Sequence, residues 1–62
     1  MTLREFRAAN GGGYTKRAAE DIPGFCRKGQ RLYGDCDDMV VIHWLYQPLN
    51  GVYDVELAEN RE

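Results

Sequence analysis

The 62-residue sequence contains no serine, one histidine and two cysteines. Without serine, nucleophilic catalysis would fall to Cys26 or Cys36 activated by His43, and no asparagine or aspartate stands out to orient that base. Cysteine more commonly serves as a small core residue. We therefore expect no catalytic residues and no enzymatic activity.

Ligand patterns for metals and cofactors are also missing. Cys26, Cys36 and His43 follow the pattern C-x9-C-x6-H, which lacks the close pairs of structural zinc sites. The aspartates of residues 34–38 lack the length and the terminal glutamate of an EF-hand loop. Residues 11–16 are glycine-rich but lack the GK[ST] ending of a phosphate loop. We expect neither a metal nor a cofactor.

Long apolar segments are absent as well. The longest, residues 39–46, is interrupted by His43 and is far shorter than the ~20 residues that cross a bilayer. The first ten residues carry charges where a signal peptide is apolar. We expect a cytoplasmic protein, where free thiols are favoured over a disulfide between Cys26 and Cys36, although that pairing stays open.

The chain is short, and its composition is that of a globular protein. Apolar residues make up 44% of the chain, which indicates folding rather than disorder. Residues 1–62 predict a single domain that buries only roughly 60% of the surface its unfolded chain exposes. Binding modules of this size are common and enzymes are rare.

Two short helices are predicted in the first third of the chain. Thr2 and Glu5 form a capping box before a helix over residues 3–9, which the glycines of residues 11–13 end. Thr15 is a suitable N-cap for a second helix that runs to about residue 21 or 22. The charges of that segment oppose the helix dipole.

A β-hairpin is predicted over residues 38–59. Asn50-Gly51 indicates the turn, with either a two-residue loop or a four-residue loop over 48–51. Both loops place the same apolar side chains on one face of the hairpin. That face consists of Val40, Ile42, Trp44, Tyr46, Tyr53, Val55 and Leu57. The other consists of Met39, Val41, His43, Leu45, Asp54, Glu56 and Ala58.

A further strand is predicted at residues 30–33. The expected fold is therefore a small α+β domain: a three-stranded antiparallel sheet that includes the C-terminal hairpin, with one or two short N-terminal helices. Leu3 and Phe6 share one side of the first helix and should cover the apolar face of the sheet.

Charge divides the chain into two unlike parts. Residues 1–34 hold seven basic and three acidic residues, a net charge of +4, whereas residues 35–62 hold one basic and seven acidic residues, a net charge of −6. Such asymmetry indicates either a surface with two electrostatic ends or two halves that fold together and pair their charges.

The acidic part suggests a small non-enzymatic inhibitor or adaptor. Carboxylates along a sheet face could occupy a basic, nucleic-acid-binding site of a partner protein, as small phage-type nucleic-acid mimics of the anti-CRISPR or anti-restriction kind do. That analogy rests on size and charge alone. The candidate partner-binding residues are Asp35, Asp37, Asp38, Asp54, Glu56 and Glu59.

Two other functions remain open. A nucleic-acid-binding regulatory module would combine the basic residues with nearby tyrosine and phenylalanine rings. Its candidate residues are Arg4, Arg7, Lys16, Arg17, Arg27, Lys28 and Arg31. A subunit of a homo-oligomer would instead pair positive with negative surfaces between copies.

Overall fold

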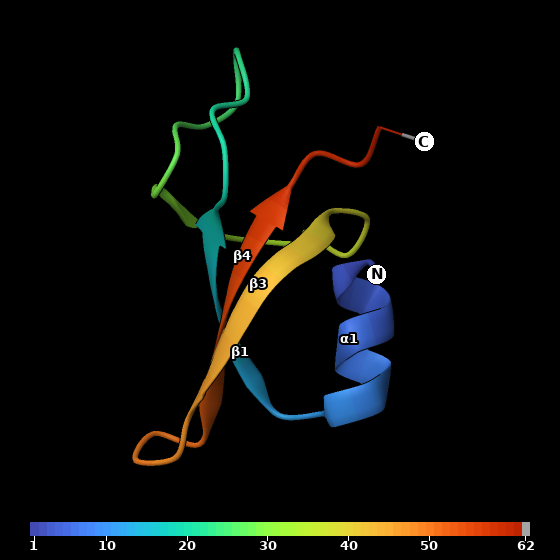
Figure 1. The fold of residues 1–62 in the computed structure, drawn as a ribbon, viewed down its shortest axis with the longest axis vertical. Coiled ribbons are helices and arrows are strands. Elements are labelled where there is room, and N and C mark those ends of the chain that lie inside the picture. The colour runs from blue at the N-terminus through green and yellow to red at the C-terminus, as the bar shows by residue number, and fades with distance from the viewer. Residues whose placement is uncertain (62) are drawn as a thin grey trace.

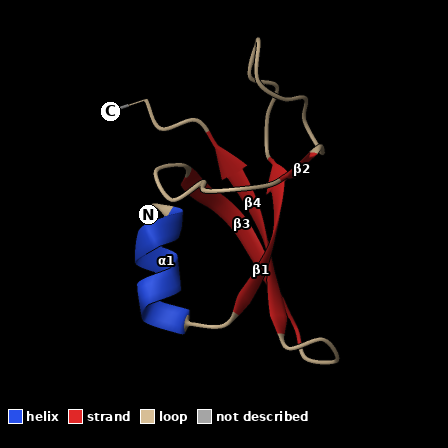
Figure 2. Cartoon of the chain, turned by 180° about the vertical axis from the view of Figure 1, so that it is seen from behind, coloured by secondary structure: helices blue, strands red, loops and turns tan. Residues whose placement is uncertain are grey.

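The computed structural model describes residues 1–61. Its elements are α1 (Leu3–Asn10), β1 (Gly13–Ala18), β2 (Arg31–Leu32), β3 (Val40–Gln47) and β4 (Val52–Ala58). The strands form one sheet in the order β2-β1-β4-β3, and α1 lies along one side of it (Figure 1, Figure 2). No helix within residues 1–61 combines the length and apolarity needed to cross a membrane.

The predicted first helix is confirmed, and α1 extends one residue further than expected. The backbone N–H of Thr2 donates to Glu5 Oε1 at 2.8 Å, and the N–H of Glu5 donates to Thr2 Oγ1 at 3.3 Å. At the other end, the N–H of Gly11 donates to the Arg7 carbonyl at 2.8 Å. Gly11 has a φ of +63°, a conformation that glycine adopts without strain.

The predicted second helix is wrong, because its first half is the strand β1. This strand runs parallel to β4, with Tyr14 beside Tyr53 and Ala18 beside Leu57. Tyrosine and threonine at its start favour a strand, and a helix would have placed Lys16 at the positive end of its own dipole. Pairing with a strand near the other end of the chain decides the conformation.

The predicted three-stranded antiparallel sheet is also wrong. The sheet has four strands and is mixed: β1 is parallel to β4, whereas β2 pairs with β1 and β3 pairs with β4 in antiparallel fashion. The strand expected at residues 30–33 shortens to Arg31–Leu32. The α+β class itself holds.

The hairpin uses the four-residue loop. Gln47 pairs with Val52, and the register continues to His43 beside Glu56. A β-bulge between Val41 and His43 then shifts the pairing, so that Val41 rather than Val40 or Ile42 lies opposite Leu57. The predicted face is right from Trp44 to Tyr46 and wrong before the bulge.

The core lies between α1 and the sheet. Leu3, Val55 and Leu57 are at most 1% exposed. The other buried apolar residues are Phe6, Ala18, Cys26, Leu32, Cys36 and Ala58. Both cysteines are free thiols. β3 contributes less than expected, since Ile42 remains 61% and Trp44 51% exposed.

An aromatic cluster continues the core to the surface. The Phe6 ring lies 5.8 Å from Tyr14, 5.6 Å from Trp44 and 5.3 Å from Tyr53, measured between centroids. Tyr46 adds a contact with Tyr53 at 4.9 Å. Burial raises the pKa of the Tyr14 hydroxyl, which donates to the Gly11 carbonyl at 2.7 Å. These contacts fix α1 against the parallel strands.

Leu57→Ala should lower the free energy of unfolding by about 2–5 kcal/mol, because it leaves a cavity under α1. Leu49→Ala is the matched control, since Leu49 is 99% exposed in the hairpin loop, and it should change stability by less than about 0.5 kcal/mol. Urea unfolding followed by tryptophan fluorescence measures both. Equal losses would contradict the described core.

The capping box predicts a specific pH dependence. Hydrogen bonds from the Thr2 backbone and side chain lower the pKa of Glu5 from its ordinary value of 4.5. The stabilisation is complete above that value and disappears as the pH falls through the lowered pKa. Glu5→Gln keeps a hydrogen-bonding side chain without the charge, so the stability advantage of the wild type should vanish in acid. Parallel pH profiles in thermal unfolding would contradict the ionised cap.

Candidate functional site

Four of the six predicted acidic residues line one cleft of about 430 Å³. They are Asp35, Asp37, Asp38 and Glu59. The cleft forms because β3 and β4 are antiparallel, so the loop that enters β3 meets the segment that leaves β4. We call this site the acidic cleft.

Apolar side chains form the other wall of the acidic cleft. Ile22, Phe25 and Met39 line it, and Phe25 is 60% exposed. The β1–β2 loop holds the first two in place: the N–H of Ile22 donates to the Cys26 carbonyl at 2.8 Å, and the N–H of Phe25 donates back to Ile22 at 3.0 Å. None of the described side chains that line the cleft is basic.

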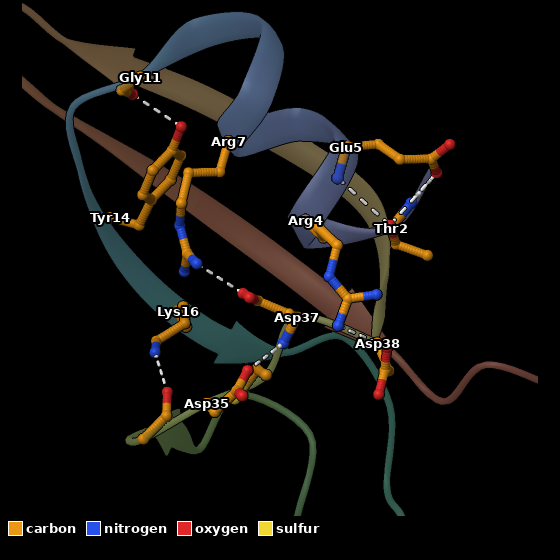
Figure 3. Close-up of polar contacts among 12 residues, drawn as sticks. Thr2, Arg4, Glu5, Arg7, Gly11, Tyr14, Lys16, Asp35, Asp37 and Asp38 are labelled. Atoms are coloured by element: carbon orange, nitrogen blue, oxygen red, sulfur yellow. Dashed lines mark hydrogen bonds and ion pairs between the residues drawn. The ribbon is translucent and has the colours of Figure 1, made fainter.

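Asp37 is tied to α1 by charge. Its Oδ1 atom lies 2.7 Å from Arg7 Nη1, and the two side chains are 20% and 44% exposed (Figure 3). That oxygen is buried and accepts no hydrogen bond of ordinary geometry from residues 1–61. The Arg7 guanidinium, which also lies 5.7 Å from the Tyr14 ring centre, is therefore its compensating charge.

Asp38 has a weaker partner on the same helix. Its Oδ1 atom lies 3.2 Å from Arg4 Nη2, but the two side chains are 86% and 65% exposed. Water screens an ion pair at this exposure, so it contributes little to stability. Figure 3 shows both arginines extending from α1 towards the loop that carries the aspartates.

Asp35 and Glu59 form no salt bridge with a described residue. Asp35 shapes the loop instead, because its carboxylate accepts from the N–H of Asp37 at 2.9 Å. Near the C-terminus, Arg61 pairs with Glu20, which raises the pKa of Arg61, and Glu59 adds a smaller attraction. Asp35 and Glu59 are thus the cleft carboxylates least neutralised by the protein itself.

Asp54 and Glu56 lie elsewhere, on the face of the sheet turned away from α1, which we call the open face. The strand register aligns one row across it: Arg31, Arg17, Glu56 and His43. His43 Nδ1 lies 3.3 Å from Glu56 Oε2. Neighbouring strands are about 4.8 Å apart, so basic residues stand next to the acidic ones. Asp54 accepts a hydrogen bond from Gln47.

The seven basic candidates are divided among four places. Arg4 and Arg7 are paired with aspartates. Arg27 and Lys28 lie in the β1–β2 loop, while Arg17 and Arg31 are neighbours on the open face. Lys16 donates to the Gly34 carbonyl. No single basic surface unites them within residues 1–61.

Within residues 1–61, the cysteine–histidine pair and the metal ligands considered from the sequence are not brought together. Cys26 and Cys36 are buried in the core, whereas His43 lies on the open face. No group of three or more histidine, cysteine, aspartate or glutamate side chains in residues 1–61 is placed to hold a metal ion. The apolar wall of the cleft was missed from sequence, because nothing local relates Ile22 and Phe25 to the aspartates.

Comparison with known proteins adds no relative. The chain matches no protein-family model, and no curated protein or solved structure is significantly similar to it. The site must therefore be interpreted from its own geometry.

The two arginine–aspartate pairs make a matched test. Arg7→Met should lower the free energy of unfolding by about 1–3 kcal/mol, because it leaves a buried carboxylate oxygen uncompensated. Arg4→Met removes an exposed pair on the same helix and should cost only about 0.2–0.5 kcal/mol. Urea unfolding measures both variants, and Arg7→Met combined with Asp37→Asn should recover part of the loss. Equal effects of the two single substitutions would contradict the burial of Asp37.

Proposed function

We propose that the protein is a small non-enzymatic binding protein that presents acidic side chains to a basic site of a partner protein. The acidic cleft is the observation that carries this proposal. It combines four carboxylates with an apolar wall and has no basic lining residue among those described. That composition fits a cationic side chain better than it fits a neutral ligand.

An arginine or lysine of the partner is the chemical group that the cleft suits. Such a side chain packs its aliphatic stem on apolar surface while its charged end stays among polar groups. Phe25 and Met39 supply the apolar surface, and Asp35 and Glu59 supply acceptors that form no salt bridge within residues 1–61. Arginine is the better match, because its planar donors engage two carboxylates and its face stacks on an aromatic ring.

The remaining charges set the character of the interaction. Arg7 and Arg4 already offset Asp37 and Asp38, so the cleft attracts a cation without being a continuous acidic surface. Asp54 and Glu56 would act as a separate, mixed-charge contact on the open face. By occupying the basic nucleic-acid-binding site of a partner, the protein would compete with nucleic acid for that site, as the phage-type mimics do.

Two free, buried thiols support a reducing compartment such as the cytoplasm.

One observation favours nucleic-acid binding as a second candidate. The Arg31 guanidinium lies 5.6 Å from the ring centre of Tyr33, which is 78% exposed, and Arg17 is its strand neighbour. Charge beside an exposed ring is suited to a single-stranded nucleic acid. The net charge of −2 and the pairing of Arg4 and Arg7 weigh against it.

Binding of a labelled hexa-arginine peptide tests the proposal. Fluorescence anisotropy at low salt should show binding that weakens as salt is added. The double variant Asp35→Asn with Glu59→Gln should weaken it about tenfold, because two carboxylates at about 0.7 kcal/mol each are removed. The matched control, Asp54→Asn with Glu56→Gln, changes the net charge equally but lies on the open face and should have a smaller effect.

Two results would contradict the acidic cleft as the binding site. One is an absence of peptide binding at low salt, and the other is an equal loss in both double variants, which would indicate attraction by net charge alone. A labelled single-stranded oligonucleotide in the same assay separates the second candidate. Binding that is lost in Arg17→Gln with Arg31→Gln would favour nucleic acid as the ligand.

A further inference from the structure

β3 has the sequence of an interior strand but lies at the edge of the sheet. Interior strands carry apolar residues on both faces, whereas strands with one wet face alternate. β4, in the middle, alternates Asp54 and Glu56 with buried Val55 and Leu57. β3 reads VVIHWLYQ and leaves large apolar side chains exposed along its length. Those are Ile42 at 61%, Trp44 at 51%, Leu45 at 58% and Tyr46 at 45% exposure.

Apart from the bulge between Val41 and His43, the edge also lacks the devices that usually keep strands apart. Edge strands are protected by charged side chains, prolines or covering segments. Residues 39–53 contain no aspartate, glutamate, lysine or arginine, and the proline in this range, Pro48, follows the strand. The N-terminus covers only the start of β3: the N–H of Val41 donates to the Met1 carbonyl at 2.8 Å, and Thr2 bridges Val40.

We propose that the open part of β3, residues 42–47, pairs in antiparallel fashion with the same segment of a second copy of the chain. No strand within residues 1–61 occupies the outer side of this segment. A two-fold axis would join two four-stranded sheets into one of eight strands. This interface is distinct from the acidic cleft and does not depend on the function proposed for it.

A second copy suits the edge because the segment is complementary to itself. A two-fold axis through Leu45 places Leu45 opposite its own counterpart and Trp44 opposite the partner's Tyr46. Aromatic and aliphatic cross-strand pairs of this kind stabilise sheets. Antiparallel pairing also brings the aspartates before β3 towards the partner's loop over residues 48–51, which carries no charge. No like charges are forced together.

The available area is that of a weak dimer. At about 200–250 Å² for each large side chain, the exposed parts of Ile42, Trp44, Leu45 and Tyr46 amount to roughly 500 Å² per copy. Two copies would bury at most roughly 1,000 Å² of side-chain surface, which is the size of a weak interface, because pairing at the edge leaves both faces of the sheet partly exposed. Tryptophan and tyrosine are also the residues enriched in such interfaces.

Sedimentation velocity of the whole chain tests the pairing. The wild type should change from the 7.1 kDa monomer to a species of twice that mass as its concentration rises to about 500 μM, a range where weak interfaces of this size assemble. Leu45→Lys should stay monomeric, because it introduces two like charges at the axis. Leu49→Lys makes the same substitution in the adjacent loop, off the edge, and should dimerise as the wild type does.

Ile42→Lys provides a second edge variant should Leu45→Lys unfold, with far-UV circular dichroism as the check of folding. A folded edge variant that is monomeric supports the proposal when the loop control dimerises. A wild type that remains monomeric at the highest concentration would overturn it, and so would a dimer that survives both edge substitutions.

Discussion

The parallel pairing of β1 with β4 is the contact on which the rest of the structure depends. It makes β4 an interior strand and aligns Ala18 with Leu57 and Lys16 with Val55. α1 precedes β1 by a short glycine link, so the same pairing brings Leu3 and Phe6 over these residues. Without β1, the hairpin would have no neighbour on that side, and two strands alone are marginally stable in water.

The second constraint is electrostatic. The positively charged first half of the chain folds against the negatively charged second half, and α1 places Arg7 and Arg4 beside Asp37 and Asp38. These salt bridges partly neutralise side chains that the sequence alone suggests as candidates for binding a partner. What remains is more localised: carboxylates beside Phe25 and Met39 in one cleft, and a row of mixed charge on the open face. The recognition that we propose for the cleft would therefore depend on shape and an apolar wall as well as on charge.

The candidate site was predictable in part. Asp35, Asp37 and Asp38 are adjacent in sequence, and an antiparallel hairpin brings its two ends together, which explains why Glu59 joins them. The separation of Glu56 from this group was not predictable, because the basic neighbour Arg17 reaches it only through the parallel strand. The apolar wall comes from a loop whose position depends on the same strand. Charge counted along the chain thus identified the carboxylates, but it did not show that they divide between the cleft and the open face.

Local chemistry determined the elements whose stabilising contacts lie within a few residues. The capping box of Thr2 and Glu5 began α1, and Asn50-Gly51 ended the hairpin loop. Where the local helix and strand propensities of a segment are nearly balanced, tertiary contacts decided its conformation. Residues 14–18 became a strand because β4 supplies their hydrogen-bond partners, and the bulge at Ile42 arose where β3 turns to meet the N-terminus. Helix and strand propensities differ by roughly a few tenths of a kcal/mol per residue, and hydrogen bonds between distant segments outweigh them. The order of residues alone does not show which segments will meet.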